Sequence, residues 1–203
     1  VAAFHALAAV GRFTNGTVHV AVVDPGVGTE RRLLGVAAHD CYWLAPDNGL
    51  LASLLRTAPA ADVRALDPAH LGLTPESATF HGRDLLAPIA AWLASGRYGF
   101  SALGPRITDP DVEERVFCAP DRIVHVDHYG NLISNLRATA ATAPRAVRLG
   151  QREVPMVRTY GDVPRGAPLA YVGSFGVVEV AIHGGSAAAT FAGGRGAPLV
   201  RID

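Results

Sequence analysis

Residues 104–120 divide the sequence into two parts with different patterns. This segment, "GPRITDPDVEERVFCAP", holds three prolines and a cluster of acids, which is typical of a linker. Before it, strand-like and helix-like stretches alternate. After it come short alternating strands at even spacing, separated by Gly, Asn and Asp turns, a pattern typical of a small all-β sandwich or barrel. We therefore expect an α/β domain over residues 1–108, a linker over 109–119 and a small all-β barrel over 120–203.

The first part should contain a mixed or parallel sheet flanked by helices. "TVHVAVVD" (17–24) is apolar enough to be buried on both faces, which favours a central strand. Helices are expected over residues 1–10, 47–58 and 83–96 because each has a helical apolar pattern or a capping residue. Pro88 lies inside the last of these helices, where it should cause a kink or mark a late first turn.

The composition excludes several classes of function. The 203 residues carry 18 basic and 18 acidic side chains, so the charge balance gives no sign of nucleic acid or an anionic membrane as partner. No apolar run reaches the ~20 residues of a membrane span. Cys41 and Cys118 lie far apart, which predicts reduced thiols in a cytoplasmic protein.

The first candidate site is "DPGVGTERR" (24–32), which follows the apolar strand. A glycine-rich loop after a strand can bind phosphate, but Asp24 would repel phosphate and no Lys follows. On residue types alone, Asp24 is a turn residue followed by surface arginines.

The second candidate is "ATFHGRDLLAP" (78–88). His81 has the one side chain whose ordinary pKa suits proton transfer near neutral pH. Gly82 removes bulk where a ligand could approach, and Asp84 could cap the following helix. A single loop histidine can equally have a structural role, so this segment alone leaves both interpretations open.

The third candidate is "HVDHYGNLISN" (125–135). Strand alternation places His125 and Asp127 on one face and His128 on the other, and no further ligand follows at regular spacing, so we predict no metal site. A hairpin with Asp127 and Asn131 at its mouth is the alternative. In "YVGSFGVVEVAIHGGSAA" (171–188), Ser174 marks a turn and Gly184 exposes backbone groups that could bind a heterocycle.

The order of these segments carries more information than any one of them. Together they resemble the S-adenosyl-L-methionine (SAM) hydrolase family, also called SAM hydroxide adenosyltransferases, which is related to the SAM-dependent fluorinase and chlorinase. The motifs that carry the resemblance are "VVDPGVGTERR", "APDNGLL", "TFHGRDLLAPIAAWLASG", "VDHYGNLISN" and "GSFGVVEVAIHGGSAA". They span nearly the whole chain.

The resemblance implies a homotrimer with SAM bound between the N-terminal domain of one subunit and the C-terminal barrel of its neighbour. The reaction would be attack of water or hydroxide on the ribose 5′ carbon, which releases adenosine and L-methionine. No cofactor or metal is implied, because SAM is itself the substrate.

The catalytic triad of the family falls on Asp24, Arg31 and His81. Our interpretation is that His81 accepts a proton from water, Arg31 stabilises hydroxide character and Asp24 orients Arg31. A dry pocket favours this reaction because the sulfonium charge and the hydroxide charge are lost together.

The family's binding residues fall in the second part of the chain. Asp127 would receive the methionine ammonium group and Ser174 would lie near its carboxylate. Asn131 would contact adenine, Tyr160 would stack on it, and the backbone at 182–184 would bind its edge. His183 stands where the family usually has Asn, so that contact would rest on backbone groups, including Gly184.

Two other functions stay open. A SAM-dependent halogenase resembles this chain, but halogenases carry an aromatic residue in place of Asp24, and fluorinase carries Ser in place of Gly82. A carboxylate at position 24 would repel halide, which favours water. A non-catalytic SAM- or adenosine-binding trimer is the third possibility. The family's opening segment, which carries the acid that binds the ribose hydroxyls, is missing, so either the sequence begins inside a longer protein or this is a shortened relative.

Overall fold

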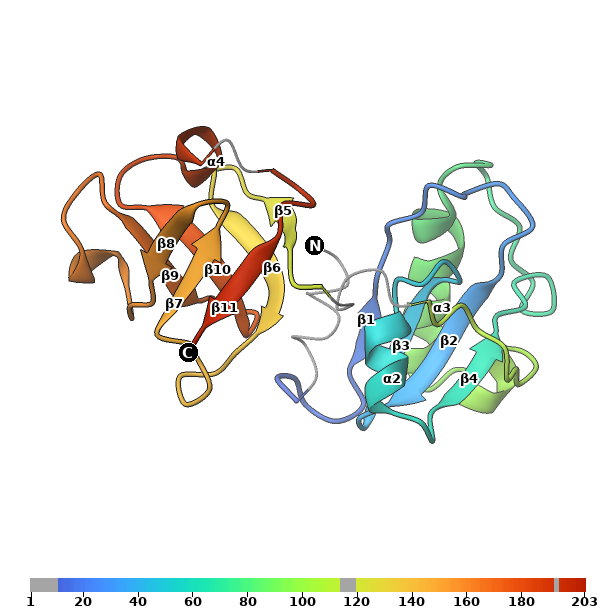
Figure 1. The fold of residues 1–203 in the computed structure, drawn as a ribbon. Coiled ribbons are helices and arrows are strands. Elements are labelled where there is room, and N and C mark those ends of the chain that lie inside the picture. Colours follow the sequence, from blue (N-terminus) through green and yellow to red (C-terminus); the bar gives the residue numbers. More distant parts are fainter. Residues whose placement is uncertain (1–10, 114–119, 192–193) are drawn as a thin grey trace. The chain divides into compact units, whose positions relative to one another are not determined.

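The computed structural model describes residues 11–113, 120–191 and 194–203 (Figure 1). The chain forms two compact units, Val1–Glu114 and Arg115–Asp203, which are described separately below. The helix expected over residues 1–10 lies outside the described residues. So do residues 114–119 of the expected linker, with Cys118. The expected boundaries at 108 and 120 stay predictions.

The first unit contains a mixed four-stranded sheet in the order β1-β3-β2-β4. Strand β1 pairs with β3 in parallel, whereas β2 is antiparallel to both β3 and β4. The strands are β1 (Val18–Val20), β2 (Leu33–Ala38), β3 (Cys41–Pro46) and β4 (Asp62–Ala65). This confirms the expected mixed sheet.

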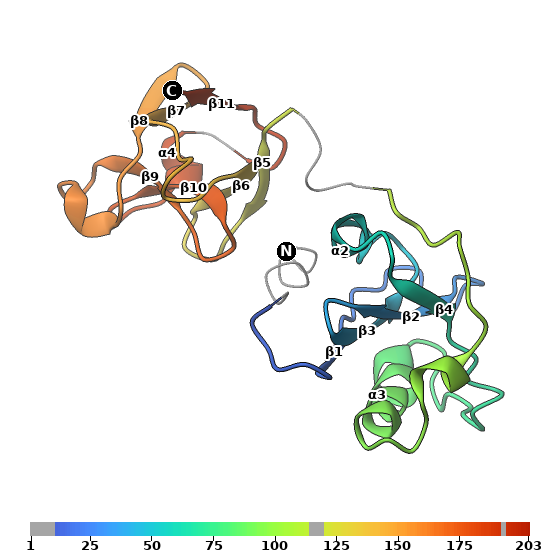
Figure 2. The same cartoon turned by 90° about the horizontal axis from the view of Figure 1, so that it is seen from below.

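Helices cover both faces of this sheet (Figure 2). Helix α2 (Ala52–Thr57) buries Leu54 in a core on one face, and α3 (Ala87–Ala94) buries Ile89 in a core on the other. A 3-10 helix, η2 (Phe100–Leu103), completes the second layer. The flanking helices therefore follow the predicted architecture.

The strand predicted over residues 17–24 is wrong in length and position. Strand β1 has only three residues and lies at an edge of the described sheet. Beyond it, Val22 and Val23 are each 51% exposed. The backbone leaves the sheet after Ala21, whose N–H donates to the carbonyl of Leu44, so the rest of the apolar run passes over the surface.

The helix predicted over residues 83–96 is present in two parts. A π-helical turn, η1 (Gly82–Leu86), continues directly into α3. Pro88 lies in the first turn of α3, immediately after the π-helical turn, which agrees with the expected late first turn. The helix predicted over residues 47–58 starts late, because the side chain of Asn48 accepts a bond from the Leu50 N–H and holds a turn before α2.

The second unit consists of two antiparallel sheets in the orders β5-β6-β10-β9 and β11-β7-β8. Both sheets contribute to one apolar core, which includes Leu132, Val180 and Leu199. A 3-10 turn, η3 (Tyr160–Asp162), and the short helix α4 (Ala187–Thr190) lie between strands. The strands are β5 (Ile123–Val126), β6 (Leu132–Arg137), β7 (Ala146–Leu149), β8 (Arg152–Pro155), β9 (Pro168–Val172), β10 (Val177–Ile182) and β11 (Leu199–Ile202).

The all-β class expected for the second unit is confirmed, but the expected barrel is not closed, because its strands form two separate sheets. In the described residues the two sheets meet through short backbone pairings: Ile123 exchanges hydrogen bonds with Ala197 and Gly196, and the Val157 N–H donates to the Ala170 carbonyl. These pairings are too short to extend either sheet into the other, so the strands stay in two separate sheets. Within the same described segments, no helix has the length and apolar content needed to cross a membrane.

Candidate active site

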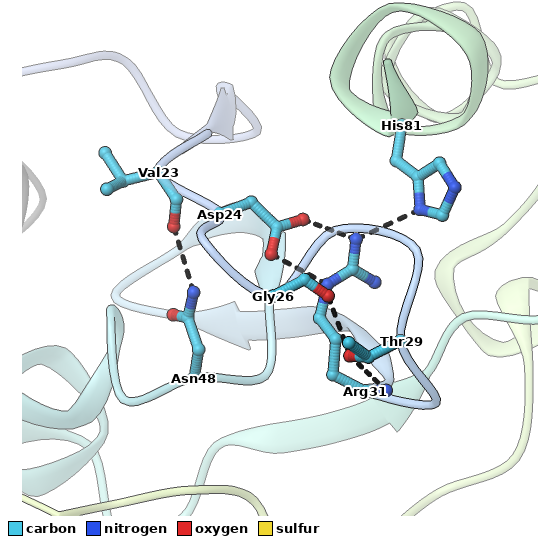
Figure 3. A network of polar contacts seen from close by, with 7 residues as sticks. All are labelled: Val23, Asp24, Gly26, Thr29, Arg31, Asn48 and His81. Carbon is cyan, nitrogen blue, oxygen red and sulfur yellow. Dashed lines mark hydrogen bonds and ion pairs between the residues drawn. The ribbon is translucent and has the colours of Figure 1, made fainter. Parts of the chain in front are cut away.

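Asp24, Arg31 and His81 meet in the first unit (Figure 3). The Arg31 guanidinium donates from Nε to Asp24 Oδ1 at 2.8 Å, and from Nη2 to Asp24 Oδ2. The same Nη2 lies 3.0 Å from Nδ1 of His81. One guanidinium therefore contacts both a carboxylate and an imidazole, so these three side chains form one cluster.

Local structure brings these distant residues together. After β1 the chain turns at Asp24, where the Val27 N–H donates to the Asp24 carbonyl. Thr29 closes a second turn by donating its hydroxyl to the Gly26 carbonyl at 2.7 Å. These turns reverse the chain and place Arg31 just before β2. His81 comes from the other side, immediately before η1.

The N–H donors of Arg31 determine which ring nitrogen of neutral His81 carries the proton. A guanidinium carries only N–H donors, so Nδ1 of His81 is the acceptor in this contact and a neutral imidazole holds its proton on Nε2. The Arg31 and Asp24 side chains are only 10% and 9% exposed. Such a buried pair depends on both partners, because either charge alone would be poorly solvated.

The triad is bordered by exposed apolar side chains. Val22 and Val23 precede Asp24, and Phe80, which is 57% exposed, precedes His81. Gly82 fits this border closely: a Cβ built at Gly82 would lie 2.9 Å from a methyl group of Val22. The absence of a side chain at Gly82 therefore lets the strand end that carries Asp24 pack against η1.

A second group of predicted residues lies in the second unit. Asp127 accepts hydrogen bonds from the N–H groups of Tyr129 and Asn131, and from the Asn131 side chain at 2.8 Å. Asn131 also lines a cavity of about 430 Å³ together with Tyr160 and Gly184. The remaining lining residues are Tyr129, Ile182 and Gly185. The structure thus brings together Asp127, Asn131, Tyr160 and Gly184.

His183 and Ser174 do not line this cavity. His183 lies beside Tyr160, with ring centroids 6.3 Å apart in an edge-to-face arrangement, and its Nδ1 bonds to the Val163 carbonyl at 2.9 Å. Ser174 is exposed in the turn between β9 and β10. Within residues 11–113, 120–191 and 194–203, no three His, Cys, Asp or Glu side chains converge as metal ligands would.

Sequence analysis did not identify three residues that lie in or beside these two groups of site residues. Asn48, in the "APDNGLL" motif, donates its amide to the Val23 carbonyl at 2.9 Å and so fixes the residue before Asp24. Tyr129 lines the cavity although it is 76% exposed. Glu179 is a buried acid within β10. The signal that could have revealed Glu179 is a lone charge inside the apolar strand "VVEVAI".

Comparisons with known proteins agree with this architecture. The model of the SAM hydroxide adenosyltransferase N-terminal domain matches residues 1–104, and that of the C-terminal domain matches residues 121–200. A protein from Salinispora arenicola named (R)-S-adenosyl-L-methionine hydrolase is 41% identical over 84% of this chain and 69% of its own length. A Thermus thermophilus protein of the same name is 38% identical over 92% of this chain and 76% of its own length.

Solved structures show the same fold. A conserved hypothetical protein from Thermus thermophilus superposes with a TM-score of 0.78 at 35% identity, over 99% of this chain and 80% of that one. An uncharacterized conserved protein from Thermotoga maritima gives a TM-score of 0.82 at 29% identity, over 100% of this chain and 83% of that one. The chain belongs to the SAM hydroxide adenosyltransferase family.

Proposed function

We propose that this protein hydrolyses SAM to adenosine and L-methionine by attack of water on the ribose 5′ carbon. The observation that carries the proposal is the buried Asp24–Arg31–His81 cluster, in a chain about 40% identical to proteins named (R)-S-adenosyl-L-methionine hydrolase. SAM, the substrate in that name, carries a sulfonium group. The cluster has the groups needed to activate the water that attacks the carbon beside the sulfonium.

Water would bind where Arg31 and His81 meet. In this proposal a water molecule replaces their direct 3.0 Å contact, accepting from Nη2 of Arg31 and donating to Nδ1 of His81. His81 then takes the proton as the oxygen attacks, and it becomes an imidazolium that already carries a proton on Nε2. Arg31 stabilises the developing hydroxide, and Asp24 holds Arg31 in place.

The surroundings suit the loss of charge during the reaction. The sulfonium leaves as a neutral thioether, so the transition state is less charged than hydroxide and SAM apart. Apolar side chains such as Val22, Val23 and Phe80 solvate that state better than they solvate separated ions. The carboxylate of Asp24 disfavours a halide in the same position, which supports water over chloride or fluoride as nucleophile.

Residues of the second unit would bind the substrate. We assign adenine to the cavity lined by Asn131, Tyr160 and Gly184, with His183 supporting the Tyr160 ring. Asp127 would receive the methionine ammonium group, because a carboxylate has lone pairs beyond those used by its three N–H donors. Ser174 would lie near the methionine carboxylate.

We also propose that the active form is a cytoplasmic homotrimer in which neighbouring subunits contribute the two groups of residues. The support is the family resemblance and the separation of the two groups between the two units. SAM is the substrate and no cofactor takes part.

Replacement of His81 tests the proposed chemistry. His81→Ala should lower the turnover number for adenosine release by about 10²- to 10⁴-fold, the range for loss of a general base. The adenosine dissociation constant should stay within about threefold, because His81 does not line the adenine cavity. His70→Ala, an exposed histidine of the same unit, is the matched control. Wild-type turnover in His81→Ala between pH 6 and 9 would contradict the role of His81.

A further inference from the structure

Glu179 is a buried acid that the proposed reaction does not use. It lies within β10, where the other five residues are apolar and buried, and it is only 8% exposed itself. Burial raises the pKa of Glu179, whereas its hydrogen bond from Tyr171 lowers it. An acid in such a strand requires a specific polar partner, because an unpaired one would destabilise the fold.

The partner of Glu179 is a chain of two tyrosines. Tyr171, opposite Glu179 on β9, donates its hydroxyl to Glu179 Oε2 at 2.7 Å. The hydroxyl of Tyr160 lies 3.2 Å from that of Tyr171. Each tyrosine hydroxyl can donate only one hydrogen bond. Because Tyr171 donates its bond to Glu179, the hydroxyl of Tyr160 must donate to that of Tyr171. Both hydrogen bonds therefore point from Tyr160 toward Glu179.

The carboxylate of Glu179 lies close to the backbone of Gly173. A Cβ built at Gly173 would lie 1.9 Å from Glu179 Oε1, so the carboxylate occupies space that any other residue at 173 would fill. Gly173 begins the turn between β9 and β10 that also carries Ser174. The position of Glu179 therefore depends on the backbone around it.

The other end of the chain has few constraints of its own. Tyr160 lies in the three-residue turn η3, whose backbone is fixed by a capping box between Thr159 and Asp162. That box does not fix the Tyr160 ring. The ring contacts Tyr171 at a tilt of 53° and His183 edge to face at 71°, so neither neighbour stacks on it in parallel. Because Tyr160 lines the cavity, its ring is available to a flat ligand there.

We propose that Glu179 and Tyr171 are positioning residues that hold the Tyr160 ring, through its hydroxyl, in the orientation that stacks on adenine. This inference rests on the proposed function, since the ligand class is the adenine of SAM or adenosine. Fixing the ring before binding reduces the conformational entropy lost when the purine enters the cavity.

Adenosine affinity, measured by isothermal titration calorimetry, tests the proposal without requiring turnover. Tyr171→Phe removes the middle hydroxyl and keeps the ring, so it should raise the adenosine dissociation constant by about 3- to 10-fold. In SAM hydrolysis the same variant should raise KM by a similar factor and leave kcat within about twofold. Tyr160→Phe cuts the same chain, and the double variant should be no weaker than Tyr171→Phe alone.

Variants of Glu179 separate positioning from stability. Glu179→Gln keeps an acceptor for Tyr171 and should stay within about twofold of the wild-type affinity, whereas Glu179→Leu should match Tyr171→Phe. Ser134→Ala is the control, because it removes another buried hydroxyl of this unit, one that donates to the Val178 carbonyl at 2.6 Å. It should leave adenosine binding unchanged.

The outcomes distinguish the two proposals. If wild-type protein hydrolyses SAM and Tyr171→Phe binds adenosine as tightly as wild type, the positioning role is wrong and the proposed function stands. If wild type binds adenosine without hydrolysing SAM, the proposed function is wrong and the affinity series still decides the positioning role. If Ser134→Ala weakens adenosine binding as much as Tyr171→Phe, the effect is one of stability and the positioning role is overturned.

Discussion

Arg31 is the residue on which the geometry of the first unit depends, because its guanidinium contacts both other members of the triad. It binds Asp24 through two nitrogens and reaches His81 with one of them. A lysine could not reproduce this, since an ammonium lacks the planar fork that matches a carboxylate. Neutralising Asp24 should therefore affect both the stability of the fold and the reaction.

We predict that Asp24→Asn lowers the free energy of unfolding by about 3 kcal/mol, because it leaves the buried Arg31 charge without its partner. Turnover should fall by about 100-fold or more as Arg31 loses its orientation. Chemical denaturation and adenosine release measure the two effects. The control Glu153→Gln breaks an exposed pair with Arg145 and should change stability by less than about 1 kcal/mol. Equal destabilisation in both variants would contradict the special role of the buried pair.

Residue types alone suggested that Asp24 was a turn residue, and it is one: its carbonyl accepts from the Val27 N–H. Its side chain has a second partner, Arg31, seven residues away, and a third residue, His81, joins from far along the chain. No local pattern contains that contact. It was expected only because the motifs in order resemble a known family.

At the level of elements, the end of β1 and the start of η1 determine where the triad lies. The two segments pack against each other where Gly82 meets Val22, two residues after β1 ends. The strand prediction failed here because β-branched residues favour extended structure whether or not they are buried. The exposed valines continue the run past the last sheet hydrogen bond.

We predict that Gly82→Ala lowers kcat/KM by about tenfold, because the new methyl group displaces Val22 and the strand end that carries Asp24. Val22→Ala in the same chain should restore activity to within about threefold, since it removes the obstructing group. Gly99→Ala is the control, as a Cβ there meets no atom within 4 Å. Failure of Val22→Ala to rescue would show that Gly82 acts by another route, such as direct contact with substrate.

Because of His19 in β1, we predict that the stability of the first unit depends on pH. Its ring stacks on Trp43 at 4.0 Å and meets Phe13 edge to face, and burial lowers its pKa below the ordinary 6.5. The folded state therefore binds a proton less readily than the unfolded state. Stability should be full above pH 6.5 and should fall as the pH drops below that value.

Tryptophan fluorescence measures this effect, because both tryptophans, Trp43 and Trp92, lie in the first unit. Urea unfolding should show lower stability at pH 5.5 than at pH 7.5, and His19→Phe should reduce that difference. His70→Gln, at an exposed position, should leave the difference as in wild type. An unchanged difference in His19→Phe would mean that other groups cause the acid sensitivity.

At the scale of the whole molecule, the change of pattern near residue 110 was enough to predict two units of different class. That the expected barrel is not closed could not be predicted, because closure depends on hydrogen bonds between strands that are distant in the sequence. The Glu179–Tyr171 pair was missed for a similar reason, since it depends on the register of β9 against β10.

Complementation tests the proposed assembly. His81→Ala alters the first unit, and a Tyr160→Ala, Asn131→Ala double variant alters the second, so each protein alone should be nearly inactive. If each active site combines units from neighbouring subunits, a one-to-one coexpressed mixture should regain about a quarter of wild-type activity, because about a quarter of the sites assemble without a substitution. No recovery would contradict sites shared between subunits.

The most direct test of the account is the fate of the oxygen that attacks SAM. Incubation of the wild-type protein with SAM in ¹⁸O-labelled water containing chloride, followed by chromatography and mass spectrometry, identifies the nucleophile. We predict equal amounts of adenosine and L-methionine, with one ¹⁸O atom in the 5′ hydroxyl of adenosine. Intact SAM, a 5′-chlorinated nucleoside or unlabelled adenosine would contradict hydrolysis at the 5′ carbon by the Asp24–Arg31–His81 cluster.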